Sequence, residues 1–306
     1  MIFFIKRRVD ISEASTRLRL LLVSELLSEQ NIQVTVTSSL FHWYKNGDVL
    51  VMSKELSRSY IFILFLFAKI CRLKLILDVC ENYLVTHSKH RSNFILASKL
   101  ADTIIVPSNY LRQCMNKMGF SNVEYIDDLI EVSAYNLGRF KRSKVVWFGA
   151  WRENFGLEND VELNLWTNLI YEFQAKGLTL SIITDDVFAA KNFFDRHNIE
   201  IDAIKWSLND WPLMLQAYDF ALIPNGKSEI ARAKSYNRIS TSLSMGLIPI
   251  VSSEWVNGDL SKHVVTVSEA KKNIDDIRKS SLLWDKSKSK SWNEKLLSQW
   301  RKVFDL

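Results

Sequence analysis

Four residues that can donate hydrogen bonds to an anion lie close together in the chain: Lys234, Ser235, Asn237 and Arg238. They come at the start of a predicted short helix, residues 236–245, which Ser235 can cap and Gly246 can end. The first turn of a helix has free backbone N–H groups and the positive end of the helix dipole, so it stabilises an anion. The cluster therefore predicts a phosphate site; the alternative is an ordinary helix start whose cations are solvated.

Short apolar runs alternate with helical patterns along the chain, which predicts parallel sheets flanked by helices. In the first half the predicted strands are residues 2–5, 34–36, 48–52, 73–79, 103–106 and 123–126. In the second half they are residues 144–148, 178–184, 219–223 and 247–251. The predicted fold class is therefore α/β, with two Rossmann-like lobes that contain parallel sheets.

A polar, basic stretch without periodicity separates the two halves, and we interpret residues 133–143 as a linker. The predicted domains are residues 1–132 and 144–306. The second domain ends in a polar helical segment that contains Trp284, Trp292 and Trp300 at equal intervals. Because this spacing spirals around a helix, we interpret the three tryptophans as docking anchors and not as one binding stripe.

The composition is that of a soluble globular protein, with 47% hydrophobic and 24% charged residues in a chain of 306. The net charge of +6 suits an anionic ligand, a nucleic acid or an anionic membrane surface. No nucleic-acid-binding module is recognisable, so nucleic acid is not an expected partner. Three cysteines without metal-type spacing predict reduced thiols of a cytosolic protein: Cys71, Cys80 and Cys114.

Ligands of parallel sheets bind beyond the carboxyl ends of the strands. In the first half this rule selects seven polar residues: Asp10, Arg17, Arg19, Lys54, Asp78, Glu81 and Ser108. A carboxylate in such a place can serve as a general base, and Asp10, Glu13, Asp78 and Glu81 are the candidates. The alternative is that these strand-end carboxylates cap the helices that follow them.

The second half resembles the donor-binding lobe of GT-B glycosyltransferases, in the retaining family 4 and family 1 group that assembles polysaccharides and lipopolysaccharides. The resemblance rests on four segments in order: the strand end Phe148-Gly149, Ile204-Lys205-Trp206, residues 218–224 and residues 246–251. The last two resemble the "ADV-LIPS" and "GxPVV" strands of the family. Residues 15–19 and 101–108 resemble the acceptor lobe more loosely. The resemblance implies two lobes with a ligand site between them.

The chain departs from the family in one motif. Many retaining GT-B enzymes have two glutamates, eight positions apart, at places that correspond to Ala233 and Thr241 here. The cationic cluster occupies the same turn, so we expect it to take over contacts with phosphate and ribose. Glu229, close upstream, can replace one carboxylate, and we favour a retaining over an inverting reaction.

The resemblance implies a hexosyltransferase of surface polysaccharide assembly, with a nucleotide-sugar donor on the second lobe and a glycan or lipid-linked acceptor on the first. The predicted donor-binding residues are Gly149, Arg152, Lys227, Lys234, Ser235, Asn237 and Arg238. The predicted acceptor-binding residues are Arg17, Arg19 and Asp78. The predicted catalytic residues are Asp10, Glu81 and Glu229. Fixed cations and a helix N-terminus can stabilise a leaving phosphate, so neither a metal nor a cofactor is expected.

Two groups that could suggest a metal have a simpler interpretation. His87 and His90 lack a nearby carboxylate or cysteine partner in the sequence, so solvated side chains are expected. Asp185 and Asp186 resemble the metal-binding acidic pair of another glycosyltransferase fold. Their place after a strand predicts a helix N-cap instead.

One apolar segment, residues 60–68, is about half as long as the ~20 residues that span a membrane. Its neighbours include several cations: Arg58, Lys69, Arg72 and Lys74. An exposed apolar side would allow peripheral contact with an anionic membrane, where lipid-linked acceptors reside. The alternative is a buried helix that leads into a buried strand. We therefore expect a cytoplasmic protein, with the inner face of the cell membrane as a second location.

Two other functions are compatible with the same pattern. A GT-B-like sugar-nucleotide 2-epimerase would need more carboxylates and histidines in the cleft than the sequence places there. A non-catalytic sugar-nucleotide-binding protein would explain why the glutamate pair is missing. Release of free nucleotide in the presence of an acceptor distinguishes a transferase from a binding protein.

Overall fold

The computed structural model describes residues 1–6, 8–39, 44–53, 58–85, 90–131, 144–151, 160–224, 229–252, 259–271, 284 and 286–306. The chain divides into two compact units. The first unit comprises Met1–Glu131, Arg232–Asn237 and Ser291–Leu306, and the second comprises Val132–Ala231 and Arg238–Lys290. Each unit has its own parallel sheet and its own core, which confirms the predicted α/β class.

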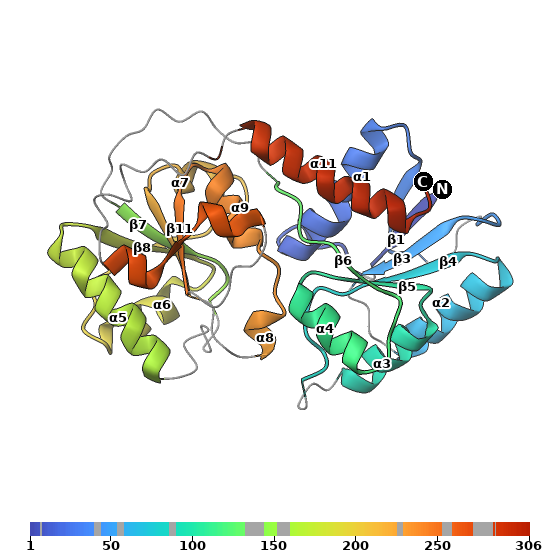
Figure 1. Cartoon of the computed structure of the whole chain (residues 1–306), viewed down its shortest axis with the longest axis horizontal. Coiled ribbons are helices and arrows are strands. Elements are labelled where there is room, and N and C mark those ends of the chain that lie inside the picture. Colours follow the sequence, from blue (N-terminus) through green and yellow to red (C-terminus); the bar gives the residue numbers. More distant parts are fainter. Residues whose placement is uncertain are drawn as a thin grey trace. The chain divides into compact units, whose positions relative to one another are not determined.

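The sheet of the first unit has the strand order β2-β1-β3-β4-β5-β6, as far as the structure describes it (Figure 1). All of its pairings are parallel. The strands are β1 Ile2–Ile5, β2 Val34–Thr37, β3 Val49–Ser53, β4 Lys74–Asp78, β5 Thr103–Val106 and β6 Val123–Tyr125. The strand β1 lies inside the sheet and is buried over its whole length, because its four residues are apolar on both faces.

Helices cover both faces of this sheet (Figure 1). They are the π-helix η1 Thr16–Leu21, and α1 Leu22–Glu29, α2 Arg58–Ile70, α3 Arg91–Leu100, α4 Asn109–Lys117 and α11 Lys286–Val303. Side chains alternate between the two faces of a strand. Phe3 and Leu50 therefore pack in a core with α2, α3 and α4, whereas Phe4 and Val51 pack in a second core with α1 and α11.

The helix α11 is anchored in the first unit by its tryptophans. Trp300 is fully buried, and its ring lies 6.1 Å from that of Phe4. The indole N–H of Trp292 donates to the backbone oxygen of Asp128 over 3.3 Å. Trp284 is different, because it precedes α11 and donates to Ser289 Oγ of that helix over 2.8 Å. The end of the chain therefore belongs to the first unit, and not to a domain of residues 144–306 as the sequence predicted.

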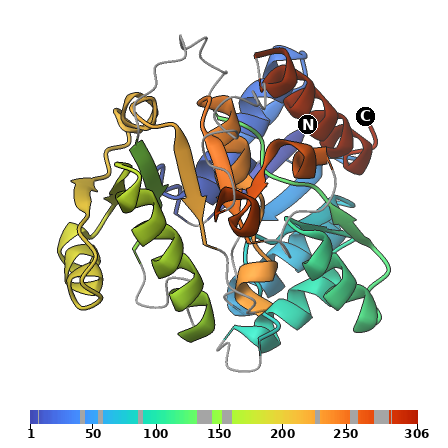
Figure 2. The ribbon, with the colours of Figure 1, turned by 60° about the vertical axis from the view of Figure 1, so that its left-hand side comes forward.

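The second unit has the strand order β12-β11-β10-β7-β8-β9 in its described part, again with parallel pairings. The strands are β7 Lys144–Phe148, β8 Thr179–Thr184, β9 Asp202–Lys205, β10 Phe220–Ile223, β11 Ile248–Val251 and β12 Val265–Thr266. The helices are α5 Asp160–Ala175, α6 Val187–Asp195, α7 Trp211–Leu215, α8 Glu229–Arg232 and α9 Asn237–Ser244, with the 3-10 helix η2 Asp259–His263. Figure 2 shows α5 along one face of the sheet, where Phe173 packs against Phe220.

Most predicted elements have the predicted type, and the differences lie at their ends. The ten predicted strands differ from the observed ones by at most one residue at either end, and the predicted helix 236–245 is α9 Asn237–Ser244. The predicted linker, 133–143, lies outside the described residues. Among the described helices, none has both the length and the apolar character that a bilayer crossing requires.

Candidate functional site

In the second unit, Gly149 follows the carboxyl end of β7 and is closely approached by Arg238. Its φ of 149° is one that L side chains rarely adopt. A Cβ atom at this position would lie 2.5 Å from Nη2 and 2.9 Å from Cζ of Arg238. Glycine is therefore required for the guanidinium to lie against the backbone at the end of β7.

Arg238 is the second residue of α9, and its guanidinium lies over the Trp147 ring, with Cζ 5.2 Å from the centroid. The side chain is half-buried, and burial lowers the pKa of Arg238 to about 10, so the group stays charged at neutral pH. Among the residues that the structure describes, no carboxylate pairs with it. A desolvated, uncompensated cation at the N-terminus of a helix is a site for an anion.

Two aspartates follow β8, and the first of them contacts the backbone just after Gly149. Asp185 Oδ1 accepts a hydrogen bond from the Trp151 backbone N–H over 2.6 Å. Asp186 accepts one from the Ala189 backbone N–H over 3.0 Å and caps α6, which confirms the predicted N-cap. Both carboxylates therefore shape the carboxyl edge of this sheet.

The segment Arg232–Asn237, which runs from the end of α8 to the first residue of α9, is part of the first unit. Ser235 donates its hydroxyl hydrogen to Asp128 Oδ2 over 2.6 Å, and the Tyr236 backbone N–H donates to Asp127 Oδ1 over 3.1 Å. Ser108 caps α4 and also donates to the Ala233 carbonyl over 3.0 Å. The Ser235 hydroxyl is thus already engaged with a carboxylate, although the sequence predicted that it meets a phosphate.

Ala233 gives a physical reason for the absence of one family glutamate. Its side chain is fully buried in the apolar core beneath α2, α3 and α4. A glutamate there would place a carboxylate among apolar side chains, at a large desolvation cost. The cationic cluster that begins at Lys234 therefore directly follows Ala233, a core residue of the first unit.

A buried network at the carboxyl edge of the first sheet positions this segment. Arg19 donates from Nε and Nη2 to Asp78 Oδ1 over 2.9 and 2.7 Å, and from Nη1 to Asp128 Oδ1 over 2.9 Å. Burial opposes the charge of Arg19, but the carboxylates of Asp78 and Asp128 outweigh it and raise the pKa of the guanidinium well above its ordinary value. Arg19 and Asp78 are both 1% exposed, and through Asp128 this buried network supports Ser235 of the segment Arg232–Asn237.

Asp127 lies next to Asp128 in this network, and the sequence predicted neither of them as a site residue. Burial and the neighbouring charge of Asp128 raise the pKa of Asp127 to about 7. Its Oδ2 accepts a hydrogen bond from the Tyr125 hydroxyl over 3.2 Å. Both aspartates follow β6, so the strand-end rule that selected Asp78 could also have selected them.

The loop after β1 holds another group of charged residues in the first unit. Arg17 donates to Glu131 Oε1 over 2.6 Å and braces the loop through the carbonyls of Ile11 and Ser12. Lys6, which the sequence analysis did not select, is buried and pairs with Glu13 over 2.7 Å.

Asp10 belongs to the same loop and is well placed to stay ionised. The hydroxyl and the backbone N–H of Ser12 both donate to its Oδ1, over 2.6 and 2.9 Å. These bonds lower the pKa of Asp10, so its carboxylate is charged but a weak base.

The remaining predicted residues belong to different elements of the two units. Glu81, Glu229 and Lys234 are exposed, on the loop after β4, at the start of α8 and in the segment before α9. Asn237 is half-buried and is the first residue of α9, directly before Arg238. Arg152, Lys227 and His87 lie outside the described residues.

A cavity of about 750 Å³ opens at the other edge of the first sheet, where the strands begin. Its lining includes Arg72, Lys74, Asp102 and Asp305, and Lys74 Nζ pairs with Asp305 over 2.6 Å. None of the predicted site residues is among the described residues that line it. The chemistry at the carboxyl ends of the strands is therefore separate from this cavity.

Neither protein-family models nor curated protein sequences match this chain. Solved structures match it over nearly its whole length. Anabaena HepE in complex with UDP has a TM-score of 0.64 at 12% identity, with 98% of this chain and 99% of that chain covered. The fold is GT-B. The pneumococcal O-GlcNAc transferase GtfA, in complex with UDP and GlcNAc, has a TM-score of 0.56 at 11% identity over 92% of this chain. TarM has a TM-score of 0.59 at 11% identity over 93% of this chain. The present chain spans 59% of the GtfA chain and 58% of the TarM chain.

Proposed function

We propose that this GT-B chain is a glycosyltransferase that moves a sugar from a nucleotide-sugar donor to a glycan or lipid-linked acceptor. The observation that carries the proposal is the Arg238 guanidinium, which lies against Gly149 without a described carboxylate partner. The fold supports it, because HepE has been solved with UDP-glucose and GtfA with UDP. A uridine diphosphate sugar is therefore the first donor to test.

In the proposed reaction, Arg238 stabilises the leaving group. The bond between the anomeric carbon and the phosphate oxygen breaks, and its electron pair stays on that oxygen. Arg238 and the positive end of the α9 helix dipole would stabilise this negative charge. The same groups would allow departure of the nucleotide without a metal, which is part of the proposal.

The second substrate of the proposed reaction is the acceptor. We place it on the first unit, beside the loop that holds Asp10 and Arg17, with Arg19 and Asp78 as its buried support. A retaining course fits this chain better than an inverting one, because Asp10 has a lowered pKa and is a weak base. Asp10, Glu81 and Glu229 remain the candidates for a catalytic carboxylate. Assembly of a surface polysaccharide in the cytoplasm is the process that we propose.

One observation favours a second function. The buried position of Ala233 excludes a carboxylate where many retaining relatives have one, so a sugar-nucleotide-binding protein without catalysis is the alternative. Both functions require a sugar nucleotide bound at Arg238, but only the glycosyltransferase converts it to product.

A thermal-shift screen with UDP-, GDP-, dTDP- and CMP-sugars tests the proposal. We expect one nucleotide to raise Tm, because a ligand that binds only the folded state stabilises it. The absence of a shift with every nucleotide would overturn both functions. Release of free nucleotide from the stabilising donor, in the presence of a glycan or lipid-linked acceptor, then separates a transferase from a binding protein.

A further inference from the structure

The helix α2 is apolar on two opposite sides. Ile61, Leu64 and Ala68 are buried against the first sheet. Four other large apolar side chains of the same helix are exposed: Phe62 by 51%, Ile63 by 42%, Leu66 by 58% and Ile70 by 70%. At 3.6 residues per turn they lie within about 100° of the helix circumference and form one stripe. Single exposed apolar residues are normal, but a continuous stripe of this kind marks an interaction surface.

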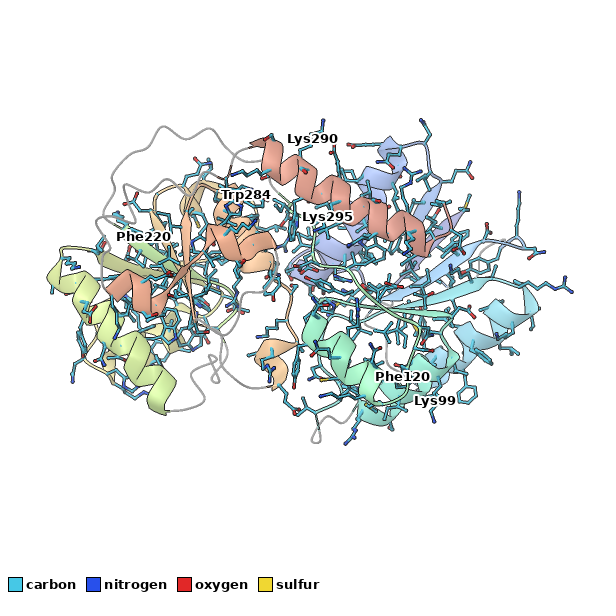
Figure 3. The ribbon with its side chains drawn as sticks, in the orientation of Figure 1. Lys99, Phe120, Phe220, Trp284, Lys290 and Lys295 are labelled. Atoms are coloured by element: carbon cyan, nitrogen blue, oxygen red, sulfur yellow. The ribbon has the colours of Figure 1, made fainter. Side chains whose placement is uncertain are left out.

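The charged residues of α2 and of the neighbouring helix α3 are all positive. The sequences of α2 and α3 contain Arg58, Lys69, Arg91 and Lys99, and neither helix contains an aspartate or a glutamate. The side chains of Lys69 and Lys99 are exposed, and the two helices pack together on the same face of the sheet. Figure 3 labels Lys99, which points outward from α3. An apolar stripe with cations beside it complements an anionic lipid surface.

We propose that the exposed side of α2, together with Lys69 and Lys99, docks this protein on an anionic lipid bilayer. The apolar side chains would enter the boundary between headgroups and acyl chains, while the two ammonium groups stay at the phosphate level. The surface uses none of the residues assigned to the donor, so the inference goes beyond the proposed function and does not depend on it.

Flotation of the full chain with lipid vesicles tests the docking surface without any nucleotide. We expect at least tenfold stronger partition to vesicles of phosphatidylcholine and phosphatidylglycerol in equal parts than to phosphatidylcholine alone. The double variant Phe62→Ser with Leu66→Ser should lower the partition at least tenfold. The double variant Lys69→Gln with Lys99→Gln should lower it about fivefold per cation on anionic vesicles. Added salt should weaken the binding of the wild type, since the attraction of the cations is screened.

The second unit supplies matched controls. Phe188 and Leu213 are 76% and 64% exposed, so Phe188→Ser with Leu213→Ser removes as much exposed apolar surface elsewhere. Lys176 and Lys191 are exposed too, and their change to Gln controls for net charge. Both control variants should float like the wild type, and all variants should keep the wild-type Tm.

Three results would overturn the proposal: no flotation of the wild type, equal flotation of Phe62→Ser with Leu66→Ser, or equal loss in the controls. Analytical ultracentrifugation tests whether a second copy of the chain, and not a lipid bilayer, covers α2. If the wild type fails to float but forms a dimer that Phe62→Ser with Leu66→Ser dissociates, a second copy of the chain covers α2. In each of these cases nucleotide binding would be unaffected, so the failure is distinct from failure of the proposed function.

Discussion

Arg19 in the first unit and Arg238 in the second are both desolvated cations near the carboxyl ends of parallel strands. Arg19 is 1% exposed and ion-paired with Asp78 and Asp128, which together raise its pKa. Arg238 is half-buried and has a lowered pKa, because burial removes water and no described carboxylate replaces it. Arg19, whose charge two carboxylates balance, therefore stabilises the fold. Arg238, whose charge no described carboxylate balances, is suited to bind an anionic ligand.

The first prediction concerns the compensated arginine. Arg19→Ala leaves the carboxylates of Asp78 and Asp128 buried without their cation, and should lower the free energy of unfolding by about 3–5 kcal/mol. Urea denaturation measures this change. Arg8→Ala is the control, because Arg8 is 88% exposed in its contact with Asp10 and should contribute less than about 1 kcal/mol. Equal effects of the two variants would contradict the structural part given to Arg19.

Ser235 tests how the segment before α9 is held. Ser235→Ala removes the hydrogen that Asp128 Oδ2 accepts, and a hydrogen bond to a charged group contributes about 1.5–3 kcal/mol. The free energy of unfolding should fall by that amount, whereas Ser92→Ala, on the exposed side of α3, should change it little. If Ser235→Ala instead preserved stability and weakened nucleotide binding, the serine would be a ligand contact after all.

Asp127, the neighbour of the Arg19 partner Asp128, should make the free energy of unfolding depend on pH. Its pKa is raised to about 7 in the folded protein, above the ordinary value of 3.8, so the folded state binds the proton more tightly than the unfolded state. The stability that this proton contributes is present below pH 4 and is lost as the pH rises through 7.

The slope of that loss is at most about 1.4 kcal/mol per pH unit. In Asp127→Asn it should disappear, and urea denaturation between pH 5 and pH 8 measures it. Parallel pH profiles of the variant and the wild type would show that Asp127 does not titrate in this range.

The smallest expected effect belongs to Arg238. Without a ligand, Arg238→Ala removes a charge whose burial nothing described compensates, at the expense of one cation–π contact with Trp147. These effects oppose each other, so the free energy of unfolding should change by less than about 1 kcal/mol. A loss as large as that of Arg19→Ala would mean that Arg238 has a structural partner.

Local patterns were sufficient to predict most of the strands that the structure describes. The run Lys144–Phe148, for example, becomes β7 because its apolar residues fill both faces of a buried sheet. The resemblance to GT-B glycosyltransferases selected Gly149, and the helix start selected Arg238; the structure brings the two together.

Long-range packing decided what the sequence could not show. Ser235 belongs to the first unit because of Asp128, which lies 107 positions away in the chain. A polar terminal helix does not reveal which unit its tryptophan packs in, and Trp300 packs in a core of the first unit. Asp127 and Asp128 were overlooked because they follow a short strand beside the expected linker, although the rule that selected Asp78 applied to them.

The central claim is that Arg238 binds the phosphates of a nucleotide-sugar donor, and calorimetric titration with UDP tests it most directly. Loss of a hydrogen-bonded charge should weaken UDP binding by Arg238→Ala about 10- to 100-fold. Arg238→Lys, which keeps the charge but not the planar fork, should retain part of the affinity. Arg196→Ala, an exposed arginine at the end of α6, should bind like the wild type. UDP binding by Arg238→Ala with wild-type affinity would contradict the account.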